Sequence, residues 1–490
     1  MIRKELLDLY QPTIGIECHV QLNTVTKLFS GASNDDRDQA PNTVVSPICF
    51  GLPGTLPVLN ERAAELAVRA GHALNAAIAQ VSSFDRKHYF YPDLPKGYQI
   101  TQLDQPIVGR GVVRVPMGSH HIDVRINRAH LEEDAGKLTH PSGANYSLVD
   151  LNRAGTPLLE IVSEPDMHSA AEAKGYAQEL YLLMKYAGVT RGDLQHGNMR
   201  FDVNISVAKK DAKVWGTRVE IKNLNSFKAV ERAVEYEVER HITLLQKGER
   251  IVQETRGWNE AKQKTISQRS KEEAMDYRYF PEPDVPPIKL SPTKITKIID
   301  AMPKLPPQLR VELSKLQLDA ATVDTLILQD ALAGLGYVHA VLATYEKAGL
   351  DAAVFVANFL VHRDIKQRQE TEQQVALPTV EQLCDVFALF KSKQLSSNGA
   401  DQLLFSLKGN QGASAKAEAE ALGLLQENNE AALEAIITEV LADPVNAKAV
   451  ADIQAGSLKA IGFLVGQVMK ASKGKANPGI VSTMIQNKLT

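Results

Sequence analysis

The segment TIGIECHVQL, residues 13–22, sets the architecture of the first half of the chain. Every second side chain in it is apolar, beginning with Ile14, and the intervening positions include Glu17 and His19. Successive side chains of a β-strand point to opposite faces of the sheet, so the pattern predicts a strand with one apolar and one polar face. Glu17 and His19 should project together from the polar face, where they suit a divalent metal ion. A strand whose polar face is only solvated explains the same pattern.

Three further segments repeat this alternation, at residues 121–127, 199–207 and 218–223. In the last two, the acids Asp202 and Glu220 share a face with amide or cationic side chains. Several strands of this kind predict an antiparallel sheet with a concave polar floor, and carboxylates on such a floor usually need a metal ion. An amphipathic sheet with one solvated face is the plainer interpretation of each strand taken alone.

The string HLEEDAGK, residues 130–137, follows the strand predicted at 121–127. Its three consecutive acids, Glu132, Glu133 and Asp134, repel one another unless cations or solvent compensate their charge. One interpretation is a carboxylate pair that binds a divalent metal ion at the exit of the strand. The alternative is an exposed acidic turn, which is the commoner case.

A proline-rich stretch divides the chain. Residues 281–292 read PEPDVPPIKLSP, and because proline fixes φ and lacks a backbone donor, we expect a linker there without regular helix or sheet pairing. Beyond it, segments such as 319–332 and 415–441 are rich in strong helix formers. We therefore predict an α+β chain with an antiparallel-sheet catalytic domain at 1–292, an all-helical domain at 293–408 and a small helical tail domain at 409–490.

The composition excludes several classes of protein. The 490 residues include 55 basic and 58 acidic side chains, so any contact with nucleic acid needs a local basic patch. The three cysteines lie far apart without a CxxC pair, which excludes a disulfide framework and a cysteine zinc finger and favours a reducing cytosol. We expect neither a signal peptide nor a membrane span. P-loop and Rossmann glycine motifs are absent, so phosphate chemistry would rely on a metal held by carboxylates.

The C-terminal end of the chain carries basic side chains but no acidic ones. After Asp452 the sequence contains no acid but five lysines, among them Lys470, Lys473 and Lys475, which follow an amphipathic helical segment. Lysines at the end of a helix complement its dipole, and they equally suit the phosphate backbone of a nucleic acid.

Long strings of this sequence resemble the B subunit of the heterotrimeric aspartyl/glutamyl-tRNA amidotransferases. They are IGIECHVQL (14–22), FDRKHYFYPDLPKGYQITQ (84–102), HLEEDAGK (130–137), DLNRAGTPLLEIVSEPD (150–166), VEIKNLNSFKAVERAVEYE (219–237), DYRYFPEPD (276–284) and IGFLVGQVMKASKGKANP (461–478). The resemblance covers nearly the whole chain.

The resemblance implies a function that composition does not show. In this family the B subunit activates the side-chain carboxyl of Glu-tRNA(Gln) or Asp-tRNA(Asn) with ATP and Mg²⁺. Ammonia from the glutaminase, which is the A subunit, then reaches it through a channel and displaces the phosphate, and a small C subunit completes the heterotrimer. The resemblance also implies a glutamine synthetase type of cradle fold, helical domains that bind tRNA, and a cytoplasmic setting.

Carried over by motif position, the family's metal and phosphate residues fall on six positions. The resemblance implies metal ligands at Glu17, His19 and Glu133, and catalytic roles for Glu132, Glu160 and Asp202, with Glu220 a further candidate. Lys87 matches a position associated with the mouth of the ammonia channel. For the tail, the resemblance favours contact of Lys470, Lys473 and Lys475 with tRNA.

Two other hypotheses stay open at this point. The chain is then either a tRNA-binding scaffold whose polar sheet only holds the 3′ end, or a stand-alone metal-dependent ligase or hydrolase for a small carboxylate. Cleavage of ATP that depends on Glu-tRNA in the assembled complex separates the first hypothesis from an amidotransferase. Activity on free glutamate and ammonia would support the second.

Overall fold

The computed structural model describes residues 8–270, 276–371, 374–426, 430–455, 458–472 and 476–489. The chain forms two compact units, Met1–Gln308 and Leu309–Thr490, and each is described by itself. Among the described residues, no helix is both long and apolar enough to cross a membrane.

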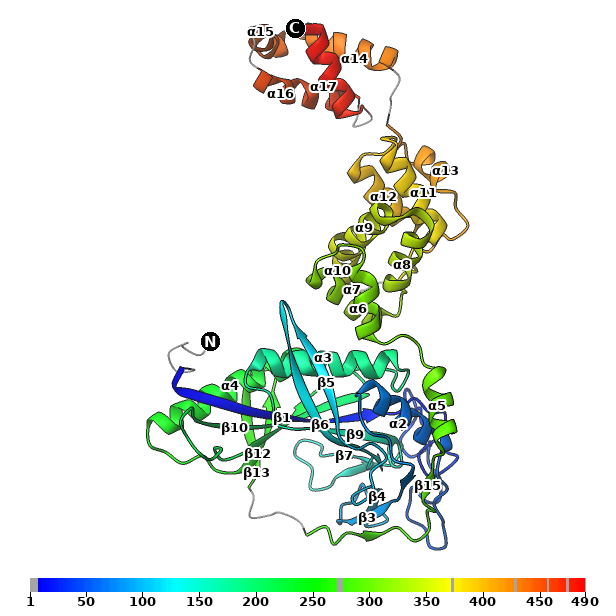
Figure 1. The fold of residues 1–490 in the computed structure, drawn as a ribbon, viewed down its shortest axis with the longest axis vertical. Helices are drawn as coiled ribbons and strands as arrows, with labels where there is room; N and C mark the ends of the chain where they lie inside the picture. The colour runs from blue at the N-terminus through cyan, green and yellow to red at the C-terminus, as the bar shows by residue number, and fades with distance from the viewer. Residues whose placement is uncertain are drawn as a thin grey trace. The chain divides into compact units, whose positions relative to one another are not determined.

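An eight-stranded sheet forms the centre of the first unit (Figure 1). In spatial order its strands are β13 (Lys264–Ser270), β12 (Glu254–Asn259), β11 (Val219–Leu224), β10 (Met199–Lys209), β1 (Tyr10–Gln21), β9 (Pro157–Ser163), β6 (His120–Glu133) and β5 (Gly111–Met117). Neighbours run antiparallel except β11 and β12, which are parallel. The predicted α+β class and the four predicted strands are confirmed.

The two faces of the sheet differ as the alternation predicts. Ile14, Ile16 and Cys18 of β1 are buried. Helices α3 (Ala170–Tyr186) and α4 (Phe227–Gln246) cover one side of the sheet (Figure 1). Both helices begin at a serine whose side chain accepts a backbone N–H of the first turn, which satisfies one of the free donors there. The other face carries the polar side chains.

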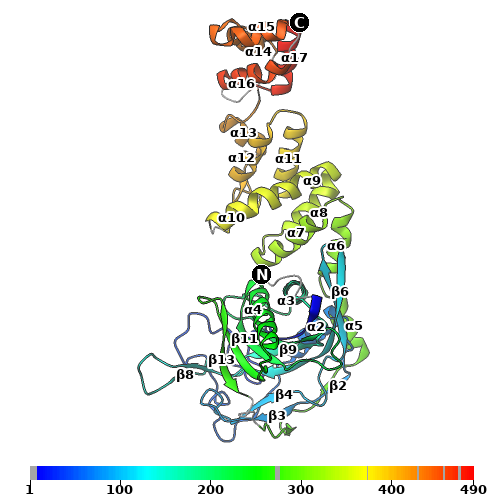
Figure 2. The same cartoon turned by 90° about the vertical axis from the view of Figure 1, so that its left-hand side faces the viewer.

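Smaller elements surround the polar face. Strands β3 (Asp85–His88), β4 (Tyr98–Thr101) and β14 (Phe280–Pro281) form a three-stranded sheet on the side away from α3 and α4 (Figure 2). The remaining elements of the unit are α2 (Glu61–Ala73), β2 (Val81–Ser82), β7 (Lys137–Thr139), β8 (Leu148–Asp150), β15 (Ile288–Lys289) and α5 (Pro292–Asp300).

The proline-rich stretch does form sheet pairs, in contrast to our expectation. Pro281 pairs with Asp85, and Ile288 pairs with Ser82, in strands of only two residues. Glu282 between them is buried and accepts two hydrogen bonds from Arg86. Short edge pairings need few donors, so prolines are tolerated beside them. The stretch therefore belongs to the first unit.

The second unit is entirely helical among its described residues. Its elements are α6 (Pro306–Ser314), α7 (Ala320–Ala333), α8 (Tyr337–Ala348), α9 (Leu350–Phe359), the π-turn η2 (Leu360–Asp364), α10 (Ile365–Thr371), α11 (Val380–Lys391), α12 (Ser397–Leu407), α13 (Ala415–Ala421), α14 (Glu430–Ala442), η3 (Pro444–Asn446), α15 (Ala447–Gln454), η4 (Leu458–Ala460), α16 (Ile461–Ala471) and α17 (Pro478–Leu489). The helix predicted at 319–332 is α7, whereas 415–441 contains two helices. Helices α14 to α17 bury a core of their own.

Candidate active site

The strand register brings four side chains into one row across the polar face. His19 of β1 lies opposite Arg200 of β10 on one side and opposite Glu160 of β9 on the other. Glu160 in turn lies opposite His130 of β6. Directly opposite side chains on one face of a sheet are close enough to interact, so the register alone joins segments that are far apart in the sequence.

One imidazole and two carboxylates from this region converge. A ligand atom from each of His19, Glu132 and Glu160 lies within 4.8 Å of the others. The Nε2 atom of His19 is 3.5 Å from Glu132 Oε1 and 3.9 Å from Glu160 Oε2. A cluster of two carboxylates and one imidazole suits a divalent cation of the Mg²⁺ or Mn²⁺ kind when other oxygens are near.

His130 compensates the charge of this cluster from the other side. Its Nε2 atom lies 3.1 Å from Glu160 and 3.6 Å from Glu132. Burial disfavours the imidazolium, but these two carboxylates outweigh burial and raise the pKa of His130 to about 9. Burial likewise opposes the charge of Glu160, yet the bond from His130 holds the pKa of Glu160 well below its usual range. Our sequence argument missed His130, although its spacing of two from Glu132 places both on one strand face.

Glu17 lies on the same face, opposite Asp202 of β10. Burial raises its pKa, and the neighbouring carboxylates of Glu160, Glu220 and Asp202 raise it further. The amide of Asn204 donates a hydrogen bond to Glu17 Oε1 at 3.0 Å. A carboxylate crowded by other carboxylates favours the binding of a proton or a cation.

Glu133 points to the opposite side of the sheet from Glu132. Its Oε1 atom accepts the backbone N–H of Ile100 at 3.0 Å and forms an ion pair with Lys96. The predicted grouping of Glu133 with Glu17 and His19 is therefore not formed. The reason is that β6 continues to Glu133, so consecutive acids alternate between faces, where we expected the strand to end near residue 127.

A cavity of about 520 Å³ opens over the polar face. Its lining includes His19, Glu132 and Asp202 together with the cationic side chains Lys87, Arg200 and Lys222. Basic side chains next to a carboxylate cluster suit a ligand that carries phosphate groups together with a metal ion.

The three cations owe their position to different partners. Lys87 Nζ lies 4.9 Å from the ring centroid of Tyr277 and 5.9 Å from that of Tyr89. Burial opposes the charge of Lys87, but Glu132 and its neighbours outweigh burial and raise its pKa. Arg200 donates to Asp134 at 2.8 Å, and Lys222 Nζ lies 3.4 Å from Asp202. All three therefore remain charged near neutral pH.

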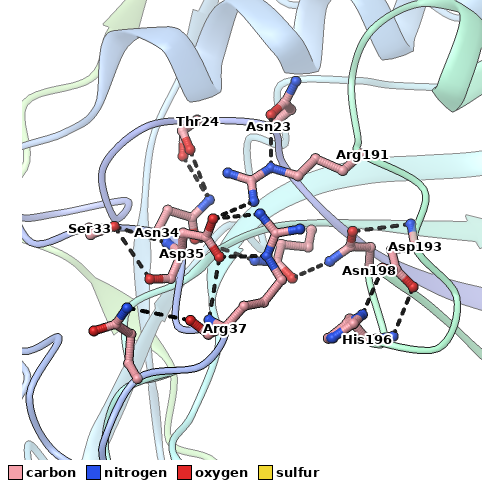
Figure 3. A network of polar contacts seen from close by, with 12 residues as sticks. Asn23, Thr24, Ser33, Asn34, Asp35, Arg37, Arg191, Asp193, His196 and Asn198 are labelled. Carbon is pink, nitrogen blue, oxygen red and sulfur yellow. Dashed lines mark hydrogen bonds and ion pairs between the residues drawn. The ribbon is translucent and has the colours of Figure 1, made fainter.

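A polar network next to the cavity fixes the segment that precedes β10 (Figure 3). Asn198 donates to Gln21 of β1 at 2.9 Å and accepts the backbone N–H of Asp193 at 3.1 Å. Arg191 forms an ion pair with Asp35 at 2.9 Å. Residues 194, 195 and 197 within this segment line the cavity, so the network holds one of its walls in place.

The predicted tRNA-binding lysines are only partly described. Lys470 is exposed in the last turn of α16. Lys473 and Lys475 lie outside the described residues. Ile461, Leu464 and Val468 of the same segment are buried in the core of the tail, so its amphipathic pattern reflects packing.

Comparison with known proteins identifies the family of this chain. Residues 12–296 match the GatB/GatE catalytic domain, and residues 340–489 match the GatB domain. The B subunit of the aspartyl/glutamyl-tRNA(Asn/Gln) amidotransferase of Synechococcus sp. (strain JA-2-3B'a(2-13)) is 44% identical over 98% of both chains. The B subunit of the chloroplastic/mitochondrial glutamyl-tRNA(Gln) amidotransferase of Physcomitrium patens is 44% identical over 98% of this chain and 86% of its own. The chain therefore belongs to the family of aspartyl/glutamyl-tRNA amidotransferase B subunits.

Proposed function

We propose that this chain activates the side-chain carboxyl of Glu or Asp esterified to tRNA, using ATP, and joins it to ammonia. The observation that carries the proposal is the cluster of His19, Glu132 and Glu160 at a cavity that Lys87, Arg200 and Lys222 also line. The products are Gln-tRNA(Gln) and Asn-tRNA(Asn).

The proposed reaction has two steps. An oxygen of the substrate carboxylate attacks the γ-phosphorus of ATP, the bond to ADP breaks, and an acyl phosphate forms. The nitrogen of ammonia then attacks the acyl carbon, phosphate leaves, and the nitrogen loses a proton to give the amide. Fixing both reactants in the cavity supplies about 7–11 kcal/mol of the barrier, and exclusion of water protects the acyl phosphate.

His19, Glu132 and Glu160 are the residues that fit a divalent cation, with Glu17 and Asp202 as neighbouring oxygen donors. A bound Mg²⁺ would neutralise phosphate oxygens next to these carboxylates. Glu133 has no part in this assignment because Lys96 and a backbone N–H already occupy its Oε1 atom.

The cations of the cavity orient the phosphate groups in this proposal. Arg200 belongs to β10, Lys222 belongs to β11 and Lys87 belongs to β3, and all three line the cavity. Lys87 contacts two aromatic rings and is near Glu132, so it is also placed to orient incoming ammonia.

The partners follow from the same proposal. A glutaminase, the A subunit, would supply ammonia, a small C subunit would complete a heterotrimer, and the complex would work in the cytoplasm. We assign the first unit, which holds the predicted 1–292 domain together with α5, to catalysis, and residues 309–408 to a helical domain. Residues 409–490 would bind tRNA, with Lys470, Lys473 and Lys475 as candidate phosphate contacts.

The test uses the assembled complex and the Glu132→Gln variant. Without this carboxylate we expect cleavage of ATP that depends on Glu-tRNA to fall about 100- to 1000-fold, while tRNA binding persists. The matched control is Glu249→Gln, at an exposed position. Near wild-type amide formation by Glu132→Gln with added ammonium would refute the site. Wild-type complex that binds tRNA but never cleaves ATP would instead indicate a scaffold.

A further inference from the structure

A buried lysine of the first unit lies against a cysteine instead of an acid. Lys27 follows β1 in the chain, and only 1% of it is exposed. Its Nζ atom donates to Cys49 Sγ at 3.4 Å, and among the described residues this sulfur is the sole hydrogen-bond partner of the ammonium group. Fully buried lysines are normally paired with carboxylates. The contact with Cys49 therefore does more than neutralise a charge.

Two other lysines with mostly buried side chains follow the usual rule. Lys96 forms an ion pair with Glu133, and Lys408 Nζ lies 2.7 Å from Asp364 Oδ1. Lys27 differs from both because a thiol takes the place of the carboxylate. A lysine amine and a cysteine thiol in direct contact are two nucleophiles side by side, which is a reactive combination once an oxidant arrives.

The surrounding residues hold the lysine and the cysteine in place. Ser46 Oγ lies 3.3 Å from Cys49 Sγ, and the thiol donates to the carbonyl oxygen of Ala154 at 3.5 Å. Gly155 packs over both side chains, because a Cβ atom there would lie 3.5 Å from Lys27 Cδ and 3.9 Å from Cys49 Sγ. The nitrogen and the sulfur are therefore kept in contact by the fold.

A small cavity lies beside the two reactive atoms. Its volume is about 20 Å³, and Lys27 and Cys49 line it together with Glu133 and Asp134. A polar space of this size holds a single water-sized group and nothing larger. Burial lowers the pKa of Lys27 and outweighs the neighbouring Cys49, so part of the population carries the neutral, nucleophilic amine.

We propose that Lys27 and Cys49 are an oxidisable pair, which hydrogen peroxide joins through one oxygen atom into a covalent N–O–S bridge. The first peroxide converts the thiol to a sulfenic acid and releases one water. As the second peroxide is reduced to two waters, the amine nitrogen bonds to the sulfenic oxygen, and the amine and the sulfenic acid each lose one hydrogen. Nitrogen and sulfur are each oxidised by two electrons, which balances the two peroxides. An inserted oxygen needs less approach of the two atoms than a direct S–N bond, and the cavity has room for it.

The bridge ties residue 27 to residue 49 as a disulfide ties two cysteines, and it removes a positive charge beside Glu133 and Asp134. Asp134 also lines the large cavity, where it accepts a hydrogen bond from Arg200 at 2.8 Å. The oxidisable pair is therefore a modification site next to the candidate active site. The inference does not depend on the proposed function, because it concerns only these two side chains and an oxidant.

The test treats the full chain with hydrogen peroxide and maps its peptides by mass spectrometry. We expect the peptides of Lys27 and Cys49 to be joined, with a mass gain of one oxygen less two hydrogens, and dithiothreitol to separate them. The bridge should also raise the unfolding temperature of the first unit by about 5 °C, because a closed loop constrains the unfolded chain. Cys49→Ala and Lys27→Met should lose both effects. The matched control, Cys384→Ser, removes a partly exposed thiol of α11 and should keep both.

The product formed at the cysteine decides the outcome. Dimedone should capture Cys49 as a sulfenic acid in Lys27→Met, where no amine is present, and much less in wild type. Equal capture in both proteins without a joined peptide would overturn the inference, as would a thiol that peroxide leaves unchanged. A joined peptide that lacks the added oxygen would indicate a direct S–N bond and would also contradict it. If Lys27→Met fails to fold, the peptide map of wild type before and after dithiothreitol still decides.

Discussion

The first unit contains two clusters of buried charged side chains, and they differ in how their acids are paired. On the polar floor beside the cavity, four acids lie near one another: Glu17, Glu132, Glu160 and Asp202. Burial raises the pKa of Glu17, and Glu160, Glu220 and Asp202 raise it further. Around Glu237 in α4, the acids Glu237 and Glu254 are both paired with Arg240 and Arg256. Acids crowded beside a cavity, with cationic side chains along its lining, suit a metal ion and a phosphate ligand. The Glu237 cluster, whose charges are paired with one another, serves folding.

The Glu237 cluster is satisfied from within the protein. Glu237 is fully buried and accepts hydrogen bonds from Arg240 and Thr265, with Arg256 3.1 Å and His241 3.2 Å away. Burial raises its pKa, but these donors outweigh burial and lower it to about 2. Helix α4 and strands β12 and β13 are therefore linked through one carboxylate.

The largest expected effect is a loss of folding stability when Glu237 is substituted, which distinguishes its cluster from the one at the cavity. Glu237→Gln removes the fully buried counter-charge of Arg240 and Arg256 and leaves them only Glu254, so we expect a loss of about 3 kcal/mol in the free energy of unfolding of the first unit. Urea unfolding followed by tryptophan fluorescence measures it, because both tryptophans, Trp215 and Trp258, lie in this unit. Glu132→Gln should lose activity with a smaller change in stability, since His130 keeps Glu160 as its counter-charge at 3.1 Å.

The pH dependence sharpens this first prediction. Because the pKa of Glu237 is lowered from 4.5 to about 2 on folding, its contribution is complete above pH 4.5 and is lost as the pH falls toward 2. The stability difference between wild type and Glu237→Gln should therefore narrow over that range. The exposed neighbour Glu235→Gln is the control and should match wild type throughout. A difference that stays constant down to about pH 3 would contradict the assignment.

The next largest expected effect is the stabilisation of the first unit by a divalent cation. A divalent cation that binds only the folded cluster stabilises it by about 2.7 kcal/mol at a hundred times its dissociation constant. We expect Mg²⁺ or Mn²⁺ to raise the unfolding temperature of the first unit in wild type and in Glu235→Gln, but not in Glu160→Gln. An equal rise in all three proteins would place the cation elsewhere.

The sequence predicted the polar floor but not the grouping of its acids. The alternation in β1 and β10 was unbroken, so Glu17, His19 and Asp202 were correctly placed on one face. In β6, a register irregularity between Ile126 and Arg128 shifts the alternation by one residue. An inserted residue of this kind moves every following side chain to the other face.

The shift in β6 explains the misplaced acid. Val124 and Ile126 are buried before the irregularity, and Ala129 and Leu131 are buried after it. Apolar periodicity therefore seemed to end near residue 127, and the acids beyond it resembled a turn. Sequence periodicity cannot reveal such an insertion, because the partner strand fixes the register. The helical segments were easier to predict from the sequence. Asp319, for example, caps the start of α7, and such a cap can be recognised from the local sequence.

The smallest effect that we predict concerns Lys222, which belongs to the cavity but is half exposed to solvent. Burial opposes its charge, yet Asp202 and Glu220 raise its pKa, so it stays cationic at the pH of any assay. If it contacts a phosphate group, Lys222→Gln should raise the KM for ATP about tenfold, which corresponds to one charge-assisted hydrogen bond of about 1.4 kcal/mol. The kcat should change less than the KM, because ground-state and transition-state phosphate are both bound. Lys228→Gln, at an exposed position of α4, is the control. A loss of kcat at unchanged KM would instead place Lys222 at the reacting atoms and enlarge the catalytic part of the cavity.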